Sequence, residues 1–349
     1  MELKIPFSLA LVVVYGPFLL EAAFDQAEEN KALEFLVKYN NITPQEDYKS
    51  TVASWNYATN LTDYNKALKT NASLTFSAFY KTMRTNASIF DTTKLSYDTA
   101  RQIKRITASA TPKDEDTLRK LTELESEMEE IYSTGKVEDS NGKMLELDPD
   151  LYAILSKSRN YSELLFAWKG WRDAVGPTLR PRYKQFVKLL NAGAKDHGWK
   201  NIGEYWRSWY EVDDLQAMVE GFWDKLKPLY KELHAYVRYK LSKEYKEMSP
   251  EGPIPAHLLG NMWAQSWVNI YELVEPYKNQ PSLDVTANMV KKGYNATAMF
   301  ELADSFFQSI GLEALPASFY EKSMITKPKD RDVICHASAW DFGINKDVR

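Results

Sequence analysis

Apolar residues recur at helical spacing along most of this sequence. In residues 216–241, steps of three and four connect Met218, Val219, Phe222, Trp223, Leu226, Leu229, Tyr230, Leu233 and Val237. This spacing predicts one long helix, kinked but not ended by Pro228. Similar patterns predict helices from Thr111–Pro112 to about Gly135, and over residues 299–311. The expected fold class is mainly α, as a single domain or part of one.

Strand signals are few. The best candidate is DVICHASAW, residues 332–340, a short apolar stretch without helical period. The segments VEDSNGK (137–143) and KDRD (329–332) are interpreted as loops inside one domain. The composition, 44% hydrophobic and 13% aromatic, provides ample material for a core, and a net charge of −4 favours neither nucleic acid nor an anionic membrane as partner.

The first 23 residues have the features of a secretory signal peptide. Lys4 precedes an apolar run from Ile5 to Leu20, and Ala22 and Ala23 are the small residues of a cleavage site. A membrane anchor is the competing interpretation, but the run is short and contains Gly16 and Pro17. We expect cleavage, secretion, and no membrane segment beyond this peptide.

Six acceptor sequons agree with passage through the endoplasmic reticulum. They are Asn41, Asn60, Asn71, Asn86, Asn160 and Asn295. We expect these asparagines at the surface, carrying glycans.

The sequence contains one cysteine, Cys335. Secreted proteins usually pair their cysteines, so one interpretation is that a disulfide partner is missing. The other is that Cys335 is a small buried apolar residue. The sequence pattern favours neither.

Recognisable catalytic motifs are absent from the sequence. The histidines His197, His234, His257 and His336 are widely separated, and no HExxH, GxSxG, P-loop or GxGxxG occurs. No set of residues is therefore predicted to bind a metal, and no catalytic residue is assigned.

Two aromatic-rich segments, residues 164–173 and 252–274, are more specific indications of a binding site than the scattered histidines. Trp beside Arg in AWKGWRD could form a cation–π or anion-holding corner, and Asn261, Gln265 and Asn269 recur every four residues, along one side of an expected helix. The simpler interpretation is that the aromatic residues belong to the core and the amides bind nearby backbone. From the residues alone, that interpretation is favoured.

Several motifs together carry a resemblance to a known family. They are WNYATNLT (55–62), LELDPDL (145–151), LLFAWKGWRD (164–173), LHAYVR (233–238), HLLGNMWAQSW (257–267), ASFYEKSM (317–324) and CHASAWDF (335–342). In this order, they resemble the angiotensin-converting enzyme family of zinc peptidyl dipeptidases. The resemblance covers essentially the whole chain after residue 23. It implies two mainly helical halves around a deep cleft, with zinc and chloride as cofactors.

The resemblance also implies roles for individual residues. His336 and Ala337 match an edge-strand position that holds peptide main chain, Gln265 matches the residue that binds the substrate's C-terminal carboxylate, and Asp148 matches an acidic residue of the far substrate pocket. Arg172 and Tyr236 match residues of the family's two chloride sites.

Disulfides differ from the family pattern in two places. The family's counterpart of Cys335 pairs with a cysteine further along, which this sequence lacks. Glu138 and Met144 stand where the family often has a disulfide-closed loop, so we expect that loop to be held by packing alone.

The family's HEMGH zinc helix and its third ligand lie beyond the position matched by Arg349. We therefore expect residues 24–349 to be an incomplete catalytic domain that is inactive and binds no metal by itself. The complete enzyme would remove C-terminal dipeptides from secreted oligopeptides. One alternative is a non-enzymatic secreted glycoprotein that keeps part of a peptide-binding cleft, as a decoy or binding partner. Another is a decayed product without function. An incomplete sequence or a truncation is favoured over the decoy.

The same resemblance predicts poor folding of the isolated chain. Helix faces bearing Trp263, Trp267, Phe306 and Phe307 would lack partners, exposing apolar surface to water. An unpaired Cys335 invites disulfide-linked oligomers, so retention in the endoplasmic reticulum is expected alongside secretion.

Overall fold

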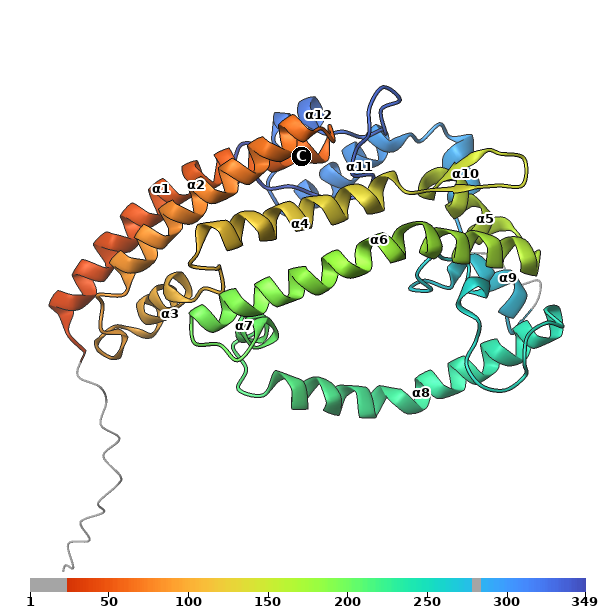
Figure 1. The fold of residues 1–349 in the computed structure, drawn as a ribbon, viewed down its shortest axis with the longest axis horizontal. Coiled ribbons are helices and arrows are strands. Elements are labelled where there is room, and N and C mark those ends of the chain that lie inside the picture. Colours follow the sequence, from red (N-terminus) through yellow and green to blue (C-terminus); the bar gives the residue numbers. More distant parts are fainter. Residues whose placement is uncertain (1–23, 278–283) are drawn as a thin grey trace, which may run out of the picture. The chain divides into compact units, whose positions relative to one another are not determined.

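Figure 1 shows the computed structural model, which describes residues 24–277 and 284–349. The expected signal peptide, residues 1–23, lies outside the described residues. The described chain is mainly helical, which confirms the expected fold class. Within these two ranges, none of the helices has both the length and the apolar character required to cross a membrane.

The described residues contain twelve α-helices. Their bounds are α1 Gln26–Ala58, α2 Asp63–Ala87, α3 Tyr97–Thr107, α4 Glu115–Thr134, α5 Tyr152–Lys157, α6 Tyr161–Asp196, α7 Ile202–Ser208, α8 Leu215–Glu244, α9 Tyr271–Val274, α10 Thr286–Lys291, α11 Ala296–Ser309 and α12 Ala317–Lys322. Single turns are η1 Thr92–Lys94, η2 Leu147–Leu151, η3 Ala256–Leu258 and η4 Val268–Ile270, and the strands are β1 Lys136–Glu138 and β2 Met144–Glu146.

The chain divides into two compact units. The smaller one contains residues 24–41 and 81–108, and its apolar core includes Leu36 and Ile103. Here the buried carboxylate of Glu29 accepts hydrogen bonds from the Thr99 hydroxyl (2.6 Å) and the Ser96 N–H (2.9 Å). Burial opposes ionisation of Glu29, but these hydrogen bonds outweigh it and lower its pKa.

The larger unit contains residues 42–80 and 109–349, and its core surrounds α6. Trp171 on α6 is almost fully buried, and α4 packs along the same helix (Figure 1). The ring of Tyr132 on α4 meets Trp171 edge to face, with 5.4 Å between ring centroids. The turn η3 and the irregular chain after it add Leu258 and Met262 to this core.

The helix predicted from Thr111–Pro112 begins slightly later, at Glu115. The reason is its cap: the carboxylate of Asp114 accepts a hydrogen bond from Thr117 N–H (2.8 Å), which satisfies one of the free donors of the first turn. The helix ends at Thr134, next to Gly135, as predicted.

The two other predicted helices are also present. Helix α8 passes through Pro228 without ending, and α11 ends at Ser309, close to Gly311. The expected exposure of apolar faces is correct for Phe306 and Phe307, which are 58% and 48% exposed. It is wrong for Trp263 and Trp267, which are partly buried against the core around α6.

The loop interpretation of residues 137–143 is correct for residues 139–143, which connect the two strands of a β-hairpin, whereas Val137 and Glu138 belong to the first strand. Strands β1 and β2 are antiparallel, and Glu138 is the register partner of Met144. The Asp139 carboxylate accepts hydrogen bonds from the N–H groups of Asn141 (2.8 Å) and Lys143 (2.9 Å), and Gly142 supplies a φ of +80°. The segment is therefore held by backbone pairing and turn hydrogen bonds, not by packing alone.

The strand expected at residues 332–340 is absent from the described structure. The chain there has no regular secondary structure and bends at His336, and its neighbours are residues at and after the end of α1: Ile334 N–H donates to the Ala58 carbonyl (2.8 Å), and Leu61 N–H donates to the Asp332 carbonyl (3.0 Å). A helix end offers only a few free carbonyls, so no ladder forms. The β-structure near the C-terminus is one isolated bridge between Asp341 and Val348.

Candidate substrate-binding site

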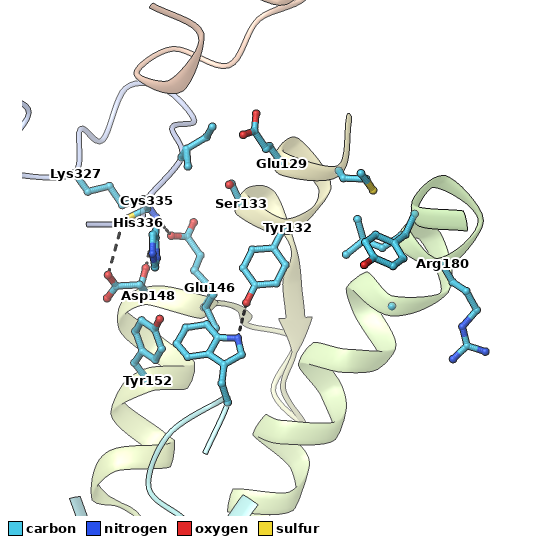
Figure 2. Close-up of a pocket in the computed structure, with 17 residues that line it drawn as sticks. Glu129, Tyr132, Ser133, Glu146, Asp148, Tyr152, Arg180, Lys327, Cys335 and His336 are labelled. Carbon is cyan, nitrogen blue, oxygen red and sulfur yellow. Dashed lines mark hydrogen bonds and ion pairs between the residues drawn. The ribbon is translucent and has the colours of Figure 1, made fainter. Parts of the chain in front are cut away.

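A cavity of about 850 Å³ opens in the larger unit, beside α4, α5 and α6. Its wall also includes residues 146–148 and residues 334–336. Asp148 and His336, two of the four residues expected to bind substrate, therefore line the same cavity (Figure 2). A pocket of this size is in the range that small ligands occupy.

One edge of the cavity is charged. Lys327 Nζ donates to Glu146 Oε2 (2.6 Å), while Lys136 lies 3.0 Å from the other oxygen of this carboxylate. Hydrogen bonds from Lys327 and Lys136 lower the pKa of Glu146, and the bond to Glu146 raises the pKa of Lys327. Both side chains are thus held in their charged forms beside Asp148.

Asp148 lies in the turn η2, where its side chain is half-buried. The Cys335 thiol lies 3.8 Å from Asp148 Oδ2, as a weak donor to the carboxylate. Burial, and next the negative charge of Asp148, raise the pKa of Cys335. Cys335 is free and half-buried at the cavity wall, so it is not the fully buried apolar residue of the second interpretation, whereas a missing disulfide partner stays a prediction.

The main chain around His336 and Ala337 has free hydrogen-bonding groups. Within the described residues, the backbone groups of residues 335–339 make no backbone hydrogen bond to another segment; the pairing stops at Ile334 N–H and resumes at Trp340 N–H. Both His336 and Ala337 are exposed. Although this segment is no strand, it offers the unpaired N–H and C=O groups that an added peptide strand requires.

Gln265 is exposed and is not part of the cavity wall. The expected continuous helix through this residue is wrong, since residues 259–267 form irregular turns. Gly260 and Ala264 have φ values of +74° and +55°, which no α-helix contains. The sequence resemblance alone therefore connects Gln265 to the site.

The other two amides of that segment bind backbone, and the expectation of three amides along one helix side fails. Asn261 accepts from Trp263 N–H (2.9 Å), and Asn269 donates to the Gly260 carbonyl (2.8 Å). Trp263 Nε1–H donates to the Tyr132 hydroxyl (2.7 Å), and both side chains line the cavity. The simpler interpretation of core aromatics and backbone-binding amides is correct here.

Arg172 occupies an environment suited to an anion. Its guanidinium lies 3.7 Å from the centre of the Trp168 ring and donates to the carbonyls of Trp168 (3.1 Å) and Met262 (2.8 Å). Burial lowers the pKa of Arg172. The Trp168 Nε1–H is buried without a hydrogen-bond partner among the described residues. A positive charge beside an unsatisfied donor fits chloride chemically.

Tyr236, the second residue expected at a chloride site, donates its hydroxyl to the Val274 carbonyl (2.8 Å). The Lys240 ammonium lies 5.5 Å from the centre of its ring. The phenol is thus engaged by the protein itself, and the fit to an anion is better at Arg172 than here.

The side chains present do not fit a zinc ion. Residues 24–277 and 284–349 contain no group of three or more His, Cys, Asp or Glu side chains that could hold a metal. Of the histidines, His257 is buried beside Tyr161 and His197 contacts the Thr111 carbonyl (2.8 Å). Only His336 lines the cavity.

Five of the six sequon asparagines are exposed, and Asn60 is half-buried. Two of them also begin helices. The side chain of Asn160 accepts a hydrogen bond from Glu163 N–H (3.0 Å) at the start of α6, and that of Asn295 accepts from Ala298 N–H (2.9 Å) at the start of α11. A glycan on the amide nitrogen would leave these oxygen acceptors in place.

Sequence reasoning missed several residues of the cavity. Tyr132 and Arg180 come from two helices with no local feature that marks them as site residues, and Arg180 lies on the wall opposite Asp148 (Figure 2). Lys327 meets Glu146 across 181 positions of sequence, so no local pattern could have paired them. Burial raises the pKa of Tyr152, another wall residue, to about 12.

Comparison with known proteins gives consistent matches. A family model described as angiotensin-converting enzyme matches residues 26–349. A protein of that name from Theromyzon tessulatum is 46% identical over 340 residues, covering 95% of this chain and 55% of that protein. Those from Rattus norvegicus and Bos taurus are each 43% identical over 333 residues, covering 93% of this chain and 25% and 26% of those proteins. The chain thus spans about half the length of the first relative and about a quarter of the other two.

Proposed function

The chain belongs to the angiotensin-converting enzyme family of peptidases, and on that basis we propose that it forms part of the substrate-binding cleft of a zinc peptidyl dipeptidase. The complete enzyme would remove C-terminal dipeptides from secreted oligopeptides. One observation carries the proposal: Asp148 and the 334–336 segment, far apart in sequence, line one cavity, where Cys335 contacts Asp148 across 187 positions.

The proposed binding mode uses the irregular segment at residues 335–339, whose main-chain groups lack backbone partners in the described structure. A peptide lying beside it would receive main-chain hydrogen bonds from groups that have no backbone partner in the described structure. The imidazole of His336 would donate to a peptide carbonyl. Asp148 would face the far end of the peptide, in a wall already polarised by the ion pair of Lys327 with Glu146.

Gln265 would bind the substrate's C-terminal carboxylate. Its support is the sequence match in GNMWAQSW and its exposure, which leaves the amide accessible. An amide donor suits a carboxylate acceptor, although it contributes less than a charged donor would.

Chloride is proposed at Arg172, supported by the half-buried guanidinium and by the Trp168 Nε1–H, which has no hydrogen-bond partner among the described residues. A bound chloride would supply negative charge beside the half-buried guanidinium. The protein's own part is to hold Arg172 in place through the carbonyls of Trp168 and Met262.

We propose that this chain does not release dipeptides by itself. The sequence holds no HExxH motif, and the described residues gather no metal-binding set. Zinc chemistry would require ligands from another part of a complete family member. Secretion is also proposed, supported by the apolar N-terminal sequence and by the exposure of five sequon asparagines.

A chimaera tests this function. The remainder of the Theromyzon tessulatum relative is fused after Arg349, and hydrolysis of an N-blocked tripeptide is measured by dipeptide release. We expect activity in the chimaera and none in the 349-residue chain. His336→Ala should lower kcat/KM about tenfold or more, because one hydrogen bond to the reacting peptide is lost.

His234→Ala is the matched control, since His234 lies on α8 outside the cavity. A folded chimaera with no activity, or equal activity in both histidine variants, would contradict the proposed role of this cavity.

A further inference from the structure

A second pocket of the larger unit, the polar pocket, lies at the other end of the segment that would hold the peptide. Its volume is about 390 Å³, and residues of α1, α2 and α4 form it together with Trp340. The charged residues in its wall are Lys69 and Glu125. Its remaining five side chains all carry hydroxyl groups: Ser50, Thr51, Ser54, Ser73 and Thr122.

Two features connect the polar pocket to the larger cavity. His336 lines the larger cavity and Trp340 lines the polar pocket, so the irregular segment 335–339 runs from one to the other. Lys69 in the polar pocket pairs with Glu129, whose carboxylate belongs to the wall of the larger cavity (Figure 2); the Nζ–Oε2 distance is 2.9 Å. The two pockets are therefore neighbours along one path.

The polar pocket contains a carboxylate without a partner. Glu129 neutralises Lys69, whereas Glu125 makes no ion pair or hydrogen bond within the described residues. Glu125 is also exposed, so a ligand can reach it. Four half-buried hydroxyls in the same part of the chain have no hydrogen-bond partner either: those of Ser50, Thr51, Ser54 and Ser73.

This lining favours a charged ligand from solution over a packed segment of protein. Apolar side chains that filled the pocket would remove the Glu125 carboxylate and the hydroxyls from water without partners, which is costly for each such group. A cation with several hydrogen-bond donors would instead neutralise the carboxylate and satisfy the hydroxyl oxygens.

We propose that the polar pocket binds an arginine side chain of a substrate peptide longer than three residues. The inference rests on the function proposed above, in which segment 335–339 holds the peptide main chain. The guanidinium donates to Glu125 and to the serine hydroxyls and lies against the ring of Trp340. This ring is itself held edge to face by Trp55, with 5.5 Å between ring centroids.

The arginine belongs to the N-terminal side of the substrate. Because Gln265 would hold the C-terminal carboxylate, a substrate can be longer only at its N-terminal side. His336 and Trp340 are four positions apart, so their Cα atoms are separated by at most about 14 Å, the span of about four extended peptide residues. A tripeptide in the larger cavity therefore does not fill the polar pocket, whereas a hexapeptide reaches it.

Calorimetry tests the proposal with the Cys335→Ser chain, which cannot form disulfide-linked oligomers. The ligands are an N-blocked tripeptide and blocked hexapeptides in which each of the three added residues in turn is Arg, Ala or Glu. We expect Arg at one of these positions to bind about fivefold more tightly than Ala, and Glu there to bind more weakly than Ala. The chimaera with the Theromyzon tessulatum remainder gives the same comparison through kcat/KM.

Variants of Glu125 test the pocket itself. Glu125→Gln should bring the ratio of Arg to Ala affinities close to one, and Glu125→Lys should reverse the preference in favour of the Glu hexapeptide. Glu123→Gln, on the same helix but outside the pocket wall, is the matched control and should keep the fivefold ratio. Circular dichroism should be unchanged in the Glu125 variants because this side chain is exposed.

The two proposals fail in different ways. If the tripeptide binds but the Arg and Ala hexapeptides bind equally, or if Glu125→Gln keeps the preference, the polar pocket has no such role while the proposed function stands. If no peptide binds, both are wrong. A preference that is present in the 349-residue chain but absent from the chimaera would show that the rest of a longer family member fills the pocket, and it would also overturn the inference.

Discussion

The Cys335 thiol lies 3.8 Å from the Asp148 carboxylate, although 187 positions separate these residues in the sequence. Burial and the carboxylate both raise the pKa of Cys335, so the thiolate is scarce near neutral pH. Alkylation by iodoacetamide at pH 8 should accordingly be slow. Asp148→Asn removes the negative charge and should accelerate the reaction severalfold, as measured by mass spectrometry.

Asp173→Asn is the control for this prediction, because Asp173 is exposed on α6 and pairs with Lys169. An alkylation rate in Asp148→Asn that equals the parent rate would show that the carboxylate does not act on the thiol.

The hairpin register predicts a new disulfide. Glu138 and Met144 are directly opposed, so cysteines at both positions should oxidise readily in a Cys335→Ser background. Closing this short loop should stabilise the chain by about 2 kcal/mol. Thiol titration and thermal melting, before and after reduction, measure both effects.

The pair Lys136→Cys with Met144→Cys, which is not opposed in the register, is the control. Free thiols that persist at positions 138 and 144 under oxidising conditions would rule out this hairpin register.

The buried His257 predicts acid sensitivity. Burial lowers its pKa, and its Nε2 has no hydrogen-bond partner among the described residues. The unfolded chain therefore binds the proton more readily than the folded chain. The contribution of neutral His257 to the free energy of unfolding is fully present above about pH 6.5, and it is lost as the pH falls through the pKa that His257 has in the folded chain. Denaturant melts from pH 7.5 to 5.5 should show falling stability, with a smaller slope in His257→Gln.

His234→Gln should keep the parent slope. The hydrogen bond from Arg349 is the main cause that lowers the pKa of Asp347 to about 2. Ionised Asp347 therefore stops stabilising the folded chain only at a lower pH, and it does not affect melts between pH 7.5 and 5.5. An identical slope in the parent and His257→Gln would contradict this origin of the acid sensitivity.

Asn160 has two separable roles, as a glycan acceptor and as the cap of α6. Expression in a eukaryotic secretory system should yield a chain heavier than its sequence mass, and glycosidase should remove the difference. Asn160→Asp should lose one glycan and keep the cap, whereas Asn160→Ala should also lose about 1 kcal/mol of stability. Gel mobility and thermal melts distinguish these outcomes; equal mobility of the parent and Asn160→Asp would mean that this sequon is unused.

Helices α4, α8 and α11 could be predicted from the sequence because their evidence is local. The spacing in α8 and α11 and the cap at Asp114 act within a few residues. The loop at Asn141–Gly142 also had a local signal, but the two short strands beside it had none and depend on pairing with each other.

The cavity required information that the sequence pattern does not contain. The ion pair of Lys327 with Glu146 depends on tertiary packing, as does the contact of Trp263 with Tyr132. The amide spacing from Asn261 to Asn269 indicated a helix, but the positive φ of Gly260 and Ala264 redirects the chain there. Family resemblance supplied Asp148 and His336 as site residues, and the structure places both at the cavity.

Peptide binding to the cavity tests the central claim most directly. An N-blocked tripeptide is titrated by calorimetry into the folded Cys335→Ser chain and into its His336→Ala and His234→Ala variants. We expect the tripeptide to bind, with an affinity that falls about tenfold in His336→Ala because one hydrogen bond is lost and that is unchanged in His234→Ala. No binding to the folded chain, or equal affinity in His336→Ala, would contradict it.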